Sequence, residues 1–148
     1  MKKITLLMAA LTIAIVSYSQ SAKEEVDLFQ AAFGMEKKAV VANFVHPMDF
    51  QKDAFWKLYD EYETARKENG KKRIQLLEQY AKEYKTMTDE QADAWTKEVI
   101  KLSTATDKLI VTYYNKIKKV TSATVATHFY QIEVYILTAI MIEVLDWV

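Results

Sequence analysis

The two histidines, His46 and His128, are the first candidates for metal or proton chemistry in this chain. Neither stands in the Glu-x-x-His pair with which helical bundles hold two iron atoms. His128 falls within an expected helix, where a partly exposed side chain is the ordinary outcome. We therefore expect no metal site and no other cofactor.

Covalent catalysis has no recognisable set of residues either. The chain has no cysteine and only two glycines, so it lacks a thiol nucleophile and a glycine-rich phosphate loop. Ser103 and Ser122 lie in no known serine motif. Most acidic residues fall on polar helix faces, but Glu133 and Glu143 stand in an apolar segment, where we expect them at the rim or paired with a lysine. The sequence thus predicts a protein that is not an enzyme.

Binding chemistry is better represented, because basic and aromatic side chains share one segment. Five basic residues lie within positions 66–73. One interpretation is a solvated helix face, since Glu63 and Glu68 are interleaved with them. The other is an adhesive surface, on which positive charge attracts acidic chains and exposed rings hold apolar segments. On this second interpretation the predicted contact residues are Trp56, Tyr59, Tyr62, Arg66, Lys72, Arg73, Lys101 and Lys108.

Hydrophobic spacing predicts the helices that would position these residues. From Ala92 to Val120 the seam positions recur at alternating steps of three and four, as in a long amphipathic helix. A helix of about 31 residues would be roughly 46 Å long. Compatible spacing runs from about Phe50 to Tyr84. The two segments should form a long antiparallel hairpin that turns near 86–88 and brings Lys101 and Lys108 alongside the basic segment.

Two further helices complete an expected all-α fold. A short one should run from Glu24 to Phe44 and end at His46-Pro47, because the residue before proline avoids the helical conformation. A last helix should run from about Ala123 to Trp147, with no charge between 134 and 142. A helix that is apolar on most sides is usually buried on most sides. Either the other helices or a second subunit should cover it, and we expect a homodimer.

The pair Asn69-Gly70 interrupts the helix expected over about 50–84. Glycine in a helix interior costs roughly 1 kcal/mol relative to alanine. A surface glycine can be tolerated at that cost. The sequence nevertheless slightly favours a bend or a short break here over a straight helix.

The stretch Met87-Thr88-Asp89-Glu90-Gln91 has the pattern of a helix start. The Thr88 hydroxyl can accept a hydrogen bond from the amide of Gln91, while the Gln91 side chain reaches back to the amide of Thr88. Met87 can pack onto the first turn, and the two acidic residues add favourable charge. Weaker patterns, which lack the final glutamine, place caps at Asp49 and Thr121.

These repeated helix starts resemble the L-T-x-x-Q motif of the Spy/CpxP family of periplasmic proteins. Met87–Gln91 is the closest copy, with methionine in place of leucine. The segments FWKLYDEYE at 55–63 and FYQIE at 129–133 are similar to the branch of this family found in Bacteroidetes. The resemblance covers about Met48–Glu143.

The resemblance implies a cradle-like dimer that acts as an ATP-independent periplasmic chaperone or stress-response protein. Its partners would be unfolded or partly folded proteins. The alternative is a periplasmic regulatory adaptor, or a metal-responsive sensor module, that acts on a membrane sensor protein.

The first residues of the chain predict export. Lys2-Lys3 precede the apolar run Ile4–Val16, and Ser17-x-Ser19 provides a cleavage site. The run is shorter than the roughly 20 residues that span a bilayer. We expect a signal peptide at 1–19, a single helical domain at 20–148, a periplasmic location and no stable membrane insertion. Cleavage would leave 18 basic and 20 acidic residues, and this near balance argues against nucleic acid as the main partner.

Overall fold

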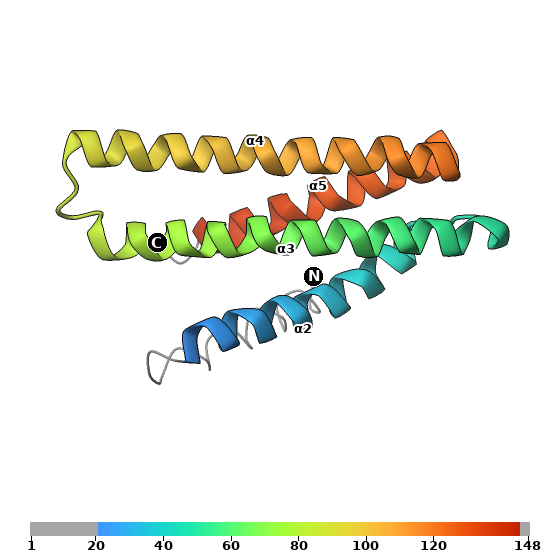
Figure 1. The fold of residues 1–148 in the computed structure, drawn as a ribbon, viewed down its shortest axis with the longest axis horizontal. Helices are drawn as coiled ribbons and strands as arrows, with labels where there is room; N and C mark the ends of the chain where they lie inside the picture. The colour runs from blue at the N-terminus through green and yellow to red at the C-terminus, as the bar shows by residue number, and fades with distance from the viewer. Residues whose placement is uncertain (1–20, 146–148) are drawn as a thin grey trace. The chain divides into compact units, whose positions relative to one another are not determined.

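The computed structural model describes residues 21–145, with side chains described for residues 33–139. The predicted signal peptide, 1–19, lies outside the described residues. The chain divides into two compact units, Met1–Val40 and Val41–Val148. All regular structure in the described residues is helical, which confirms the all-α prediction (Figure 1). The helices are α2 (Ser21–Phe44), the short 3-10 helix η2 (Asp49–Gln51), α3 (Lys52–Glu83), α4 (Asp89–Val120) and α5 (Ala123–Leu145).

Helices α3 and α4 are the longest elements, with 32 residues each. They lie side by side, joined by the short connection between Glu83 and Asp89 (Figure 1). α3 runs unbroken through Asn69-Gly70, so the predicted break is wrong. The amide of Asn69 donates to the Thr106 hydroxyl of α4 at 3.4 Å. Packing against α4 therefore outweighs the roughly 1 kcal/mol that glycine costs in a helix.

The start of α4 forms as the sequence predicts. The amide of Gln91 donates to Thr88 Oγ1 at 3.3 Å, and the amide of Thr88 donates to Gln91 Oε1 at 2.9 Å. Both halves of the capping box are thus present, with Asp89 and Glu90 in the first turn. Two amides at the helix start are satisfied by side chains, and this fixes where α4 begins.

The other two predicted caps are each wrong by one residue. Asp49 lies inside η2 and pairs with Lys52 at 2.7 Å, while the position before η2 is Met48. Thr121 ends α4 instead of starting α5, because its hydroxyl donates to the carbonyl of Ile117 at 2.7 Å. Ser122 caps α5, accepting from the amide of Val125 at 3.2 Å. Between the adjacent residues Thr121 and Ser122, the end of α4 thus leaves Ser122 to cap α5.

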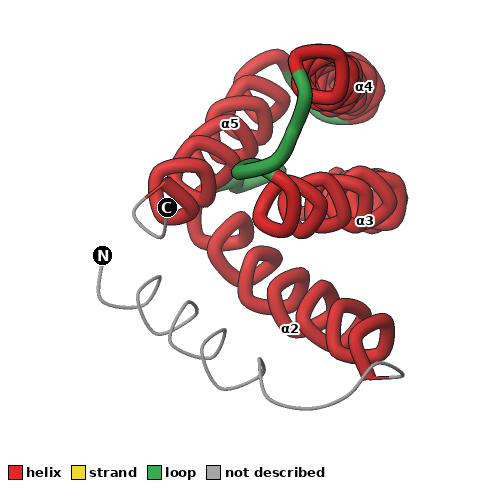
Figure 2. Tube along the Cα trace, turned by 90° about the vertical axis from the view of Figure 1, so that its left-hand side faces the viewer, coloured by secondary structure: helices red, strands yellow, loops and turns green. Residues whose placement is uncertain are grey.

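The core of the second unit lies where α3, α4 and α5 meet (Figure 2). Tyr62 of α3 packs edge-on against Phe129 of α5, with ring centroids 5.2 Å apart, and against Tyr113 of α4 at 5.5 Å. Such edge-to-face pairs add to the stabilisation from burial. The remaining buried members are Val41, Val45, Phe55, Tyr59, Ile110, Ile117, Val125, Ala126 and Ile132.

Burial changes sharply along the α3–α4 pair. We call residues 70–83 of α3 and 89–102 of α4 the distal half, and the rest of both helices the proximal half. All side chains of the distal half are described, and only Leu102 among them is buried. The proximal half contains the aromatic core. The distal half is therefore a pair of helices with little buried surface between them.

Helix α5 is only partly covered in the residues whose side chains are described. Phe129 and Glu133 are fully buried, but Tyr135 is 59% exposed and Val134 is also exposed. Within the part of α5 whose side chains are described, the prediction of burial on most sides is thus not met. No described helix is both long enough and apolar enough to span a membrane.

Candidate binding surface

Two of the predicted contact residues, Tyr59 and Tyr62, belong to the core. Both are fully buried, so their assignment to an exposed adhesive surface is wrong. They fill the space between α3, α4 and α5, where Tyr59 lies 6.3 Å from Phe129 between ring centroids. Trp56 is half-buried beside them, with its ring 5.5 Å from that of Tyr59.

Arg66 is also inside the protein. Its guanidinium pairs with Glu63 at 2.9 Å, and the two side chains are 9% and 10% exposed. A buried arginine beside a buried carboxylate is structural, because separating the pair would leave a charge in the core. The prediction that Arg66 belongs to an adhesive surface is therefore wrong.

Glu133 of α5 completes a polar cluster in this core. Tyr62 donates a hydrogen bond to its carboxylate at 2.6 Å, and the side chain of Glu133 is fully buried. The expectation of a rim position is therefore wrong for Glu133, whereas the side chain of Glu143 lies outside the described residues. Burial, and then the charge of Glu133, raise the pKa of Tyr59 and Tyr62 well above the ordinary tyrosine value.

The histidines stand apart from this cluster. His46 is exposed, and His128 is half-buried with its ring 5.7 Å from that of Phe44. Among the described residues no three histidine, cysteine or acidic side chains come close enough to hold a metal ion. The structure therefore gives no candidate metal centre in that part of the chain.

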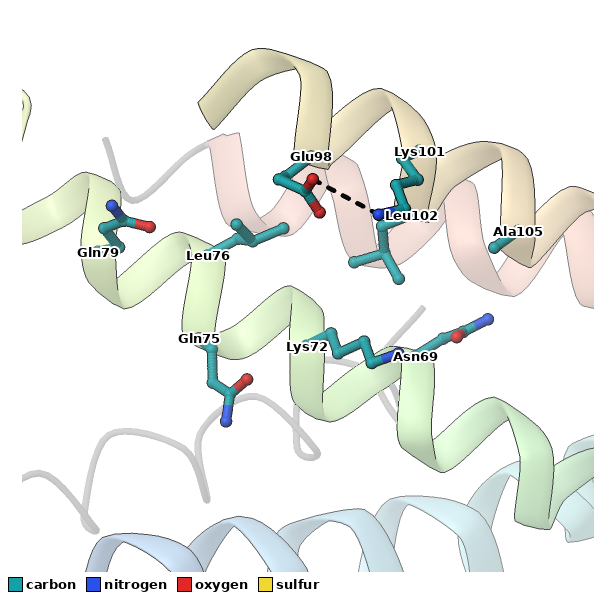
Figure 3. Close-up of a pocket in the computed structure, with 9 residues that line it drawn as sticks. All are labelled: Asn69, Lys72, Gln75, Leu76, Gln79, Glu98, Lys101, Leu102 and Ala105. Atoms are coloured by element: carbon teal, nitrogen blue, oxygen red, sulfur yellow. Dashed lines mark ion pairs between the residues drawn. The ribbon is translucent and has the colours of Figure 1, made fainter. Parts of the chain in front are cut away.

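Two of the predicted basic residues meet at one groove. Lys72 of α3 and Lys101 of α4 both line a groove of about 400 Å³ between the two helices, which lies mostly in the distal half (Figure 3). Lys108 is exposed on α4 but does not line it. We call this groove the α3–α4 groove, and its lining consists of Asn69, Lys72, Gln75, Leu76, Gln79, Glu98, Lys101, Leu102 and Ala105.

Arg73 lines a different, smaller hollow of the distal half. Its neighbours there are apolar and include Leu77, Trp95 and Val99. Leu77 is 39% exposed. A basic side chain thus lies beside apolar surface that solvent can reach, which is the combination that the sequence had placed at Tyr59 and Tyr62.

Three aromatic residues lie next to this hollow, and the sequence did not predict them as contact residues. Tyr80 lies 4.7 Å from Trp95 and 5.8 Å from Tyr84, between ring centroids. We call these three residues the tip cluster. Tyr80 and Tyr84 are 37% and 50% exposed, and the indole N–H of Trp95 donates to the carbonyl of Leu76 at 2.9 Å. The four-residue spacing of the tyrosines is visible in the sequence, but their exposure depends on tertiary packing.

Comparison of the chain with protein-family models, curated proteins and solved structures gives no match.

Proposed function

We propose that this protein is an ATP-independent chaperone that binds non-native polypeptides on the distal half of the α3–α4 pair. One observation supports this most directly. Arg73 lies in one hollow with Leu77 and Trp95, and Trp95 joins that hollow to the exposed tyrosines of the tip cluster. Positive charge and solvent-accessible apolar surface therefore lie next to each other on this part of the protein.

The two kinds of side chain would act at different stages of binding. Among the described residues neither Lys72 nor Arg73 has a carboxylate within ion-pair distance, so their charge is available to attract acidic chains. Such attraction acts over roughly 10 Å at 0.1 M salt. Apolar contact would then retain the client, because each Å² of apolar surface buried gains about 25 cal/mol and is little affected by salt.

The resemblance to Spy/CpxP proteins supports the same proposal. It adds a periplasmic location after removal of residues 1–19, and assembly as a homodimer. The competing function from the same resemblance is a regulatory adaptor that acts on a membrane sensor protein. The two functions differ in their partners, because a chaperone binds many unfolded clients and an adaptor binds one folded partner.

The test is aggregation of chemically unfolded clients, without nucleotide, in the presence of purified residues 20–148. We expect suppression at a few-fold molar excess, with higher salt slowing capture more than it speeds release. Tyr80→Ser should weaken retention. Phe50→Ser in η2 is the control, because Phe50 is an exposed aromatic residue that lies outside the distal half. If several unrelated clients aggregate as before, the chaperone proposal fails and the adaptor takes its place.

A further inference from the structure

The α3–α4 groove differs in chemistry from the tip cluster. Its floor is apolar, formed by Leu76 and Leu102, while lysine and amide side chains line its walls (Figure 3). We propose that this groove binds an extended polypeptide segment in which leucine-like side chains alternate with acidic ones. The inference rests on the proposed function, since it names the class of client segment that the distal half selects.

The dimensions of the groove fit a short extended segment. The lining residues on α3 run from Asn69 to Gln79, which corresponds to about 15 Å along a helix. An extended chain advances roughly 3.3 Å per residue, so four or five residues fit along this length. Alternate side chains of such a segment point to opposite sides. Apolar side chains can therefore face the floor while the intervening ones face the rim.

The charge of the groove favours acidic side chains at the rim. Lys72 is exposed and pairs with no carboxylate of the described residues. Lys101 pairs with Glu98 at 3.6 Å, but these side chains are 77% and 60% exposed. An exposed pair of this kind contributes little free energy, so an incoming carboxylate can replace Glu98. Two lysines on opposite walls, against one glutamate, leave the groove positive.

Side-chain amides supply the remaining hydrogen bonds. The backbones of α3 and α4 are bonded within each helix, so the groove offers a ligand only side chains. An extended segment exposes main-chain N–H and C=O groups that need partners. Gln75 can both donate and accept, and Asn69, whose nitrogen donates to Thr106, keeps its oxygen as an acceptor. The groove is thus suited to a polypeptide rather than to a purely apolar ligand.

The experiment compares two labelled hexapeptides, Leu-Glu-Leu-Glu-Leu-Glu and its glutamine counterpart, by fluorescence anisotropy with residues 20–148. We expect the acidic peptide to bind up to about fivefold more tightly, the most that one exposed ion pair provides. K72Q should remove most of this preference. K108Q is the matched control, since Lys108 is an exposed lysine outside the groove, and it should keep the preference. A105E, which places a carboxylate in the groove, should weaken binding of the acidic peptide.

Equal binding of the two peptides would overturn the inference. So would a K108Q variant that loses as much preference as K72Q, because binding would then follow overall charge. Circular dichroism and the melting temperature of each variant check that it folds. If the acidic peptide fails to bind while the wild-type protein still suppresses client aggregation, the groove inference falls and the proposed function stands. If the peptides behave as expected but clients aggregate unhindered, the groove inference stands and the chaperone proposal falls.

Discussion

Thr88 stabilises the start of α4 through contacts with residues close to it in the sequence. Its hydroxyl and the side chain of Gln91 satisfy two amides at the start of α4. Neither residue lines the α3–α4 groove or belongs to the tip cluster. The motif that carries the family resemblance therefore has a structural explanation that is separate from binding.

Thr88→Ala should lower the free energy of unfolding by about 1 kcal/mol, because one amide at the helix start loses its partner. Urea denaturation followed by circular dichroism measures this loss. Client capture per folded molecule should stay unchanged. Loss of capture at unaltered stability would instead show that Thr88 takes part in binding.

Tyr59 and Tyr62 predict how stability depends on alkaline pH. Both have a pKa raised above 10.0 in the folded protein, first by burial and then by the charge of Glu133. Above about pH 10 the unfolded chain loses these protons while the folded chain retains them. The stabilising contribution of the two tyrosines is complete below the pKa of tyrosine in the unfolded chain. It is lost as the pH rises above that value. The two tyrosines together should lower stability by about 2.7 kcal/mol for each pH unit above 10.

Denaturation at closely spaced pH values from 9 upward, at about half-unit steps, measures this slope. Tyr59→Phe should remove roughly half of the slope that the two tyrosines cause. Ile110→Val is the control, since it changes the core by one methylene and should cost about 1 kcal/mol without altering the slope. If Tyr59→Phe leaves the dependence of stability on pH unchanged, the inference that Tyr59 stays un-ionised in the core is wrong.

At the scale of the helix, α3 is one continuous element that contains a glycine in its interior. Gly70→Ala should therefore raise the free energy of unfolding, by up to about 1 kcal/mol. Ala81→Gly at an exposed position of the same helix is the matched control, and it should lower stability by a similar amount. Thermal denaturation of both variants tests the pair. If Gly70→Ala destabilises instead, its half-buried site has no room for a methyl group.

Periodicity was sufficient to predict α3 and α4, because a seam with steps of three and four follows from helix geometry. It could not say which turns of α3 are buried. Tyr59 and Tyr62 lie in the core, while Tyr80 on the same helix and Tyr84 directly after its last residue are exposed. The difference arises from Phe129 of α5, which packs on the first two. A contact between segments so far apart in the chain leaves no local pattern in the sequence.

For the same reason, the sequence did not show which basic residues of α3 are buried. Arg66 and Lys72 share one segment of similar composition, yet Arg66 is buried and Lys72 is exposed. Glu63, three residues before Arg66, gives the buried guanidinium a partner. The three-residue spacing is compatible with an ion pair between Glu63 and Arg66, but it does not show that this pair would be buried. Basic side chains and exposed aromatic side chains therefore lie together nearer the turn than the sequence predicts.

At the scale of the whole molecule, the exposed apolar side chains of α5 favour a homodimer. Tyr130, Val134 and Tyr135 are all exposed, by 37%, 37% and 59%. Light scattering of residues 20–148 at micromolar concentration should give about twice the mass of one chain. Val134→Glu should shift the protein toward a monomer, because a carboxylate would be buried in the interface. Gln131→Glu adds the same charge at another exposed position of α5 and should leave the dimer intact. A monomeric wild-type protein would contradict the proposal.

The uneven burial along α3 also has a consequence for how the protein opens. Residues 55–66 of α3 pack into the aromatic core, whereas no side chain of residues 70–83 is buried. Backbone amides in the first segment should exchange with solvent deuterium only when the whole unit unfolds, while those in the second should exchange through local opening of the helix pair. One uninterrupted helix would thus contain two cooperative units. The part expected to open most readily is the part that contains the α3–α4 groove and the tip cluster, so opening would change the separation of the two helices at the proposed binding surface.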